Sequence, residues 1–357
     1  MEQIRILVVG CGNMGASHAA AYHKLAGFEI VGLVSRGDSK HRVNTMLESA
    51  YPTFDHYDDA LSQTEPDAVC IATYPDTHEE YALKAFSAGA HVFIEKPLAD
   101  SVVGAERVVQ AAKDSGKKLV VGYILRYHPS WIKFIEIGKT LGNPLVFRMN
   151  LNQQSQGYMW DVHRNLMKSL SPIVDCGVHY IDVMCQMTEA RPIRVSAIGA
   201  RLTDDIPLDN YNYGQLQIHF DDGSVGWYEA GWGPMISETA FFVKDVIGPK
   251  GAVSIVANKA GAKGQSDSVE AHTQTESLRV HYADIDNNNN KFIRPDEWID
   301  LTDEPSHQEL CDREQLHFLQ SIREDLDLSK SMEDAINSLR IAFACDESVK
   351  TGGMVKL

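Results

Sequence analysis

A glycine-rich turn near the start of the chain constrains its fold more than any other feature. The run Ile4–Val9 is short, apolar and rich in β-branched residues, as expected for a strand buried on both faces of a parallel sheet. A helical pattern over residues 16–25 follows the turn. In a G-x-G-x-x-G turn the glycines permit the tight bend, the approach of a pyrophosphate and close helix–strand packing. The pattern predicts a dinucleotide site formed by Gly10, Gly12, Asn13, Met14 and Gly15.

The end of the next strand-like run, residues 29–34, bears on which dinucleotide would bind. An NAD site usually places an acidic residue here to hold the adenosine ribose, but this chain has Ser35 and Arg36. A hydroxyl and a guanidinium group suit a 2′-phosphate, so the sequence favours NADP(H) over NAD(H). The alternative is that Arg36 is only solvated and that Asp38 binds the ribose.

Strands and helices continue to alternate up to residue 122. Further strands are predicted at 67–73, 90–94 and 118–122, with helices at 77–87 and 101–115, which indicates a doubly wound parallel sheet. Ligands bind such sheets at the carboxyl ends of the strands, so we assign Thr73, His78, Glu95 and Lys96 to the cofactor site. Lys96 can also polarise a substrate oxygen, and Pro97 restricts its backbone. The alternative is an ordinary Glu-Lys pair in a turn.

From about residue 123 the pattern changes to long strand-like runs, which predict an α+β domain with an open, mostly antiparallel sheet. These runs are 144–152, 191–201, 211–220, 224–231, 241–247 and 252–257, and Asp221-Asp222-Gly223 marks a hairpin. Helices are expected at 172–187, 306–324 and 332–350. We therefore place a Rossmann domain at 1–122 and a second domain at 123–357, with the last helix able to pack back on the first domain.

The helix predicted from Pro172 carries two groups suited to proton transfer. Asp175 and His179 are four residues apart and share one helix face, and Asp182 comes next on that stripe. The other faces are apolar, so the helix is buried and its polar stripe must face a partner or a cavity. A carboxylate beside an imidazole can form a general base with the group that orients it. The alternative is a hydrogen-bonded core histidine.

Composition excludes several classes of partner. The net charge of −16 disfavours nucleic acid and anionic membranes. None of the six cysteines forms a C-x-x-C pair, so we expect reduced thiols and no metal site. The apolar run before Gly10 is too short for a signal peptide, and we expect a cytoplasmic protein. Residues 286–297 resemble an EF-hand loop, but Lys291 replaces its glycine and Pro295 breaks the following helix, so a polar loop is expected.

Taken together, these motifs resemble the glucose–fructose oxidoreductase / inositol dehydrogenase / rhizopine-catabolism (Gfo/Idh/MocA) family. The glycine motif, Glu95-Lys96-Pro97 and Asp175-x-x-x-His179 carry the resemblance, together with residues 123–129 and the ending 342–352. The segment 168–172 departs from the glycine-rich pattern common before the aspartate. The resemblance implies oxidoreductase activity on sugars or polyols, with catalytic roles for Lys96, Asp175 and His179.

The resulting hypothesis is reversible hydride transfer between nicotinamide and a secondary alcohol or ketone of a sugar, sugar derivative or cyclitol. His179 would move the hydroxyl proton, Asp175 would hold the imidazole and Lys96 would stabilise the alkoxide. Alternatives are a nicotinamide-dependent glycosidase of the same fold and a non-catalytic dinucleotide sensor. A homodimer or homotetramer through the second domain's sheet is also expected. The predicted substrate-binding residues are Lys96, Tyr123, Arg126, Trp160, Asp161, His163, Asp175 and His179.

Overall fold

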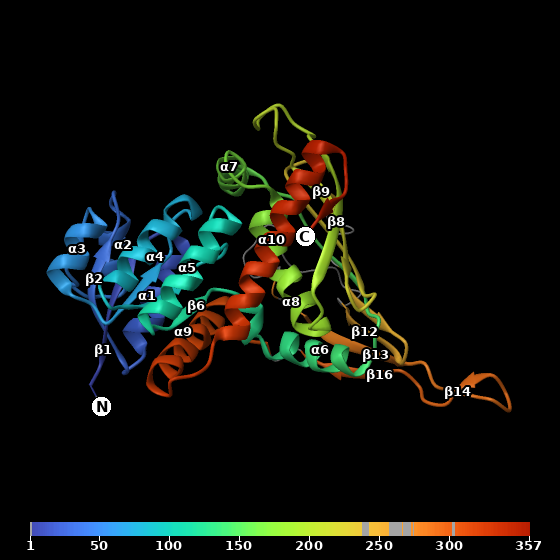
Figure 1. Ribbon diagram of the computed structural model, residues 1–357. Helices are drawn as coiled ribbons and strands as arrows, with labels where there is room; N and C mark the ends of the chain where they lie inside the picture. Colours follow the sequence, from blue (N-terminus) through green and yellow to red (C-terminus); the bar gives the residue numbers. More distant parts are fainter. Residues whose placement is uncertain (1, 238–242, 257–265, 267–272, 274, 302–303) are drawn as a thin grey trace. The chain divides into compact units, whose positions relative to one another are not determined.

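The computed structural model describes residues 2–237, 243–256, 266, 273, 275–301 and 304–357. They form two compact units (Figure 1): unit 1 comprises residues 1–124 and 306–336, and unit 2 comprises residues 125–305 and 337–357. The division at 124 lies two residues from the expected domain boundary. The segment that returns to unit 1 is 306–336, which ends inside the last long helix. Residues 241, 242 and 257, at the ends of two expected strands, lie outside the described residues.

Unit 1 is built on a six-stranded sheet in the order β3-β2-β1-β4-β5-β6, and all its pairs are parallel. This order confirms the predicted doubly wound fold, and its switch point lies between β1 and β4. Strand β3 has only two residues, too few for a hydrophobic pattern to reveal it. The strands are β1 (Ile4–Val9), β2 (Phe28–Val34), β3 (Thr53–Phe54), β4 (Ala68–Ile71), β5 (His91–Ile94) and β6 (Leu119–Val121).

Among the described residues, six α-helices lie entirely within unit 1 and flank this sheet, and one of them comes from the far end of the chain. Helix α9 packs against α1, and its Phe318 ring lies 6.1 Å from the rings of both Phe28 and Phe93. Unit 1 therefore draws part of its core from residues beyond 306. The helices are α1 (Asn13–Lys24), α2 (Ser39–Met46), α3 (Tyr57–Thr64), α4 (His78–Ser87), α5 (Val102–Ser115) and α9 (His307–Arg323).

Unit 2 contains a nine-stranded sheet in the order β16-β13-β12-β11-β7-β10-β9-β8-β17. Within the described residues β7 and β10 pair in parallel and the other pairs of this sheet are antiparallel, as predicted. Gly223, at φ +87°, makes the expected β9–β10 hairpin. The strands are β7 (Val146–Gln153), β8 (Pro192–Ala200), β9 (Tyr213–Phe220), β10 (Val225–Trp232), β11 (Lys244–Gly248), β12 (Gly251–Val256), β13 (Ser277–Tyr282), β16 (Glu297–Asp300) and β17 (Val355–Lys356).

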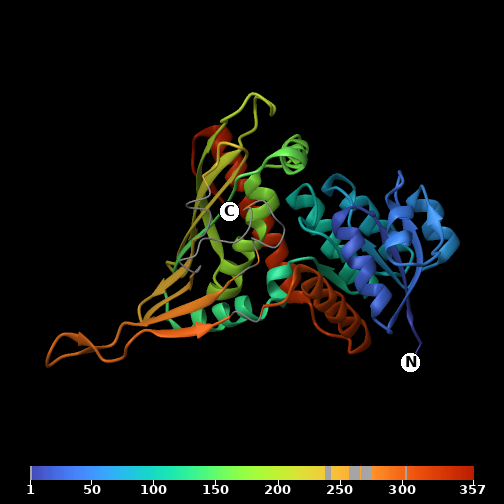
Figure 2. The same cartoon turned by 180° about the vertical axis from the view of Figure 1, so that it is seen from behind.

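Helices α6 and α8 lie on one face of this sheet (Figure 2), where α6 contacts β12 and α8 contacts β10. The sequence pattern did not predict α6 or α7. None of the helices in the described part of the chain is long and apolar enough to cross a membrane. The helices are α6 (Pro129–Thr140), α7 (Gly157–Leu166), a π-helical turn (Ile173–Gly177), α8 (Val178–Thr188) and α10 (Ser329–Thr351), whose first eight residues belong to unit 1.

A hairpin arm occupies the segment that resembled a calcium loop. It pairs β14 (Ile285–Asp286) with β15 (Lys291–Phe292), and it projects from the end of the unit 2 sheet (Figure 2). The side chain of Asp286 accepts hydrogen bonds from the backbone N–H of Asn288 and the amide of Asn289, both at 2.9 Å. The polar side chains thus stabilise the turn itself.

Candidate active site

The glycine motif forms a cradle after β1 that only small residues allow. Gly10 has φ +91°, and a Cβ there would lie 2.3 Å from the carbonyl oxygen of Ala72. A Cβ on Gly15 would lie 1.8 Å from the Gly10 oxygen, so α1 could not sit so close to the strand. Gly12 has open space around it, with no atom within 4 Å of a built Cβ. This opening at the start of α1 fits a pyrophosphate on the helix N-terminus.

A buried lysine that was not predicted from the sequence fixes the loop after β2. Lys40 is buried, and its Nζ donates hydrogen bonds to the carbonyls of Ser35 and Gly37 and pairs with Asp55 at 2.7 Å. The Ser35 hydroxyl donates to the Gly37 carbonyl and accepts from Ser39, which leaves the exposed Arg36 as the cation of this loop that faces solvent. That Ser35 and Arg36 contact the cofactor stays a prediction. The short run from Ser35 to Lys40 places a lysine near this loop, which was the available sequence signal. The burial of Lys40 depends on its pairing with Asp55, which the run does not show.

His78 connects two loops at the carboxyl edge of the sheet. It is fully buried, with one ring nitrogen 2.8 Å from the Pro97 carbonyl and the other 3.1 Å from the Thr73 carbonyl. Burial lowers the pKa of His78, although the two carbonyls oppose this. The Thr73 hydroxyl lies 2.7 Å from that of Thr77. The geometry supports His78 as a link between the β4 loop and the Lys96-Pro97 loop; cofactor contacts by Thr73 and His78 stay predictions.

Glu95 and Lys96 follow β5 and differ in exposure. Lys96 is partly exposed, whereas Glu95 is 6% exposed and its carboxylate accepts hydrogen bonds from His18 (2.7 Å) and from the Lys96 backbone N–H (3.2 Å). The Glu95 side chain thus points into the protein, and Lys96 carries the polar group at this edge. A cofactor contact by Glu95 stays a prediction.

In unit 2, Asp175 belongs to a π-helical turn that the sequence pattern did not reveal. The turn Ile173–Gly177 runs directly into α8, where His179 is 6% exposed. π-turns occur frequently at functional sites, because the extra residue redirects side chains. The Cys176 thiol lies 3.5 Å from an Asp175 oxygen and 3.8 Å from the Gln153 side-chain oxygen. Asp175 therefore lies in an irregular turn that packs against β10, and His179 follows it in the regular helix α8.

An aromatic stack lies beside Asp175. His163 stacks on Trp232 with 4.3 Å between ring centroids and 7° between planes, and its Nδ1 lies 2.9 Å from the Ser155 hydroxyl. The Trp232 indole donates to Gln153 at 2.8 Å. Burial lowers the pKa of His163 to about 4, and the Asp175 charge acts in the opposite direction. His163 is thus a neutral ring near the Asp175 carboxylate.

The other predicted substrate-binding residues of unit 2 lie in three different environments. Trp160 is partly buried and packs against the cluster of Met167, Ile206 and Trp232, whereas Asp161 is exposed and pairs with Arg164. Arg126 forms a two-pronged ion pair with the buried Asp182, through Nε at 2.9 Å and Nη2 at 2.5 Å. Asp182 therefore holds the Arg126 guanidinium in place.

Tyr123, the last residue predicted to bind substrate, belongs to unit 1 and is 1% exposed. Of the eight, Trp160, Asp161, His163, Asp175 and His179 come from α7 and the adjoining π-turn and α8. The contributions of Gln153 and Trp232 could not be found from sequence, since they lie on strands far along the chain.

Comparison with known proteins places this geometry in a family. Residues 4–123 match the NAD-binding Rossmann fold of an oxidoreductase family, and residues 133–357 match that family's C-terminal alpha/beta domain. The chain belongs to the Gfo/Idh/MocA oxidoreductase family.

Among curated proteins, the chain is 31% identical to inositol 2-dehydrogenase of Paracoccus denitrificans over 186 residues, 51% of this chain and 53% of the relative. It is 32% identical to 4-carboxy-2-hydroxymuconate-6-semialdehyde dehydrogenase of Sphingobium over 127 residues, 36% of this chain and 40% of the relative. The chain thus spans about half the length of the curated relatives it matches.

Solved structures match over the whole chain. GenD2 from gentamicin A biosynthesis, solved with NAD, has a TM-score of 0.74 at 21% identity and covers 100% of this chain and 97% of its own. WlbA of Bordetella pertussis, solved with NADH and UDP-GlcNAcA, has a TM-score of 0.77 at 19% identity and covers 100% and 98%. These likenesses support the fold.

Proposed function

We propose that the protein is a dehydrogenase or reductase that acts on a secondary alcohol or ketone of a sugar, sugar derivative or cyclitol, with NADP(H) preferred over NAD(H). The observation that carries the proposal is the Asp175–His179 segment, with a π-turn at Asp175 and a buried His179, in a chain whose glycine cradle fits a dinucleotide. Family membership and the partial match to inositol 2-dehydrogenases support the substrate class.

In this reaction the nicotinamide supplies a hydride acceptor or donor. The protein residues move the proton and stabilise charge. His179 takes the hydroxyl proton during oxidation and returns it during reduction. Asp175 holds the imidazole, and the Lys96 ammonium stabilises the negative charge that develops on the substrate oxygen.

The absence of an acidic residue at the end of β2 supports the preference for NADP(H). Ser35 and Arg36 follow Val34. Lys40 binds the carbonyls of this loop, and Arg36 is exposed. A guanidinium can bind a phosphate through two parallel hydrogen bonds.

The test is a panel of cyclitols, aldoses and nucleotide-linked sugars, offered with NAD and NADP in parallel and followed by nicotinamide absorbance. The parent should turn over at least one compound, whereas His179→Ala and Lys96→Met should each lose about 10²- to 10⁴-fold in kcat. Full turnover by both variants on that compound would exclude the mechanism. A tightly held cofactor with no net reduction during glycoside cleavage would instead indicate the glycosidase alternative.

A further inference from the structure

A chain of buried polar side chains lies behind Lys96 within unit 1. Tyr22 and His18 come from α1, Gln315 from α9 and Glu95 from the end of β5. Their exposed fractions are 1%, 0%, 0% and 6%, respectively. Buried polar groups on three separate elements cost stability unless they satisfy one another, so their geometry carries information.

The hydrogen bonds among these four side chains all donate in the same direction, from Tyr22 toward Glu95. The Tyr22 hydroxyl donates to Gln315 Oε1 at 2.5 Å, which turns the Gln315 amide N–H toward His18 Nδ1 at 3.0 Å. In this arrangement Nδ1 accepts from Gln315, and Nε2 donates to Glu95 Oε1 at 2.7 Å. The Phe93 ring, 4.8 Å from the imidazole and edge-on to it, holds its plane.

Glu95 connects this hydrogen-bonded series to Lys96. Its Oε2 accepts the Lys96 backbone N–H at 3.2 Å. Burial on its own would raise the pKa of the Glu95 carboxyl, but the His18 hydrogen bond and the Lys96 charge lower it overall. Glu95 is thus an anion beside the Lys96 ammonium, and the His18 hydrogen bond contributes to keeping it ionised.

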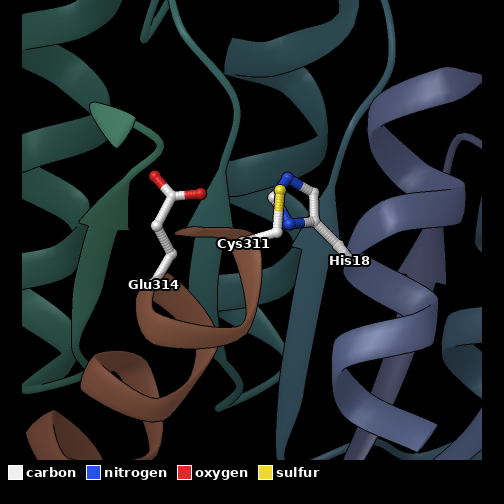
Figure 3. A group of neighbouring side chains, drawn as sticks. All are labelled: His18, Cys311 and Glu314. Carbon is white, nitrogen blue, oxygen red and sulfur yellow. The ribbon is translucent and has the colours of Figure 1, made fainter. Parts of the chain in front are cut away.

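The nearby Glu314 and Cys311 offer a competing interpretation (Figure 3). With His18 they form a buried group whose donor atoms lie within 4.8 Å of one another, and neither Glu314 oxygen has a hydrogen-bond partner among the described residues. A metal ion could use these atoms only by displacing Glu95 or Gln315 from His18. Burial and the Glu95 charge raise the pKa of Glu314, so a neutral acid accounts for the same geometry without a metal.

We propose that His18 and Gln315 are positioning residues for Lys96. They hold the Glu95 carboxylate in one place and in its charged form, and Glu95 in turn fixes the backbone and the charge state of Lys96. The proposal rests on the proposed function only where it assigns Lys96 a role in the reaction.

The test measures the Lys96 amine directly and needs no substrate. The full-length protein is acetylated with trace acetic anhydride, and peptide mass spectrometry compares labelling of Lys96 with that of the exposed Lys113. In His18→Leu, Glu95 loses its donor and takes up a proton, so Lys96 loses its charged neighbour. Only the neutral amine reacts, and Lys96 should therefore label about three- to tenfold faster than in the parent.

Two matched variants separate positioning from general loss of structure. His18→Gln keeps an N–H near the place of Nε2 and should restore labelling toward the parental rate. Ser321→Ala removes a different buried hydrogen bond on α9, from its hydroxyl to the His317 carbonyl, and should leave Lys96 labelling unchanged. Gln315→Leu should act in the same direction as His18→Leu, and it provides the test if His18→Leu does not fold.

The proposal is overturned if folded His18→Leu or Gln315→Leu protein labels Lys96 at the parental rate. It is also overturned if the purified parent holds a stoichiometric transition metal that His18→Gln releases. The proposed function fails by a different result, full turnover in Lys96→Met and His179→Ala, which would leave the labelling outcome intact.

Discussion

The two units provide their candidate functional groups in different ways. In unit 1 the cofactor cradle depends on backbone: Gly10 and Gly15 would each clash with main-chain atoms if they carried a side chain. In unit 2 the surroundings of Asp175 depend on side chains. Gln153 of β7 lies near Cys176 and accepts from Trp232 of β10, and His163 of α7 stacks on Trp232. A site formed by the backbone is encoded by one short stretch of sequence. A site formed by side chains combines residues that are far apart in the sequence.

The largest expected effect tests the backbone half of this contrast. Gly15→Ala places a Cβ 1.8 Å from the Gly10 oxygen, so the loop must move. We expect a loss of about 2 to 4 kcal/mol in unfolding free energy and of NADPH binding, measured by denaturant titration and nucleotide fluorescence.

Gly12→Ala is the matched control for that prediction. Because the space around Gly12 is open, this variant should keep parental stability while its Cβ weakens NADPH binding. Equal stability of Gly15→Ala and Gly12→Ala would contradict the backbone account.

The second prediction concerns acid and the aromatic stack of unit 2. The pKa of His163 is about 4 in the folded protein against 6.5 ordinarily, so below pH 6.5 the unfolded state binds a proton that the folded state does not. His163 therefore makes a contribution to the free energy of unfolding that is fully present above pH 6.5. That contribution declines as the pH falls, by up to about 3 kcal/mol near pH 4.

His163→Phe keeps a ring to stack on Trp232 and removes the titrating group, so denaturant titrations between pH 7 and pH 4 should show a shallower loss than in the parent. His41→Ala, at an exposed position on α2, should retain the parental slope. An unchanged slope in His163→Phe would show that this ring is not the acid-sensitive group.

The third prediction concerns the contact between β7 and β10. Gln153→Met removes the acceptor of the fully buried Trp232 indole N–H. We expect a loss of about 1 to 3 kcal/mol, because the indole is left without a partner. Gln217→Leu, on the exposed face of β9, should change the unfolding free energy by less than about 0.5 kcal/mol. Similar losses of unfolding free energy in the two variants would show that the Gln153–Trp232 hydrogen bond does not stabilise this contact.

The smallest effect concerns cofactor choice. Arg36→Glu replaces the exposed cation at the end of β2 with an acid suited to a ribose. The ratio of kcat/KM for NADP over NAD should fall by about 10- to 100-fold, measured on the best compound of the panel. Arg42→Glu, a charge reversal at an exposed position on α2, is the control. If the ratio falls equally in both variants, the preference for NADP reflects the overall charge of this surface and not a specific contact by Arg36.

How much could be predicted from sequence follows the same contrast. The β1 turn, the Asp-His spacing and the strands β7 to β12 of unit 2 follow local patterns, so their residues could be named in advance, whereas β13, β16 and β17 were not predicted. The burial of Lys40, the π-turn around Asp175 and the partners of Arg126 depend on contacts between distant segments. Periodicity reports which face of an element is apolar, but not which residue of another element meets it.

The division of the chain has a consequence for truncation. Helix α9 contributes Phe318 to the rings of Phe28 and Phe93 and Gln315 to His18. A polypeptide ending at residue 124 would therefore leave these groups open to water, although it would contain all six strands of the parallel sheet. Unit 1 is therefore not contained in one continuous stretch of the chain, and a nascent chain has all of its residues only after synthesis has passed residue 336.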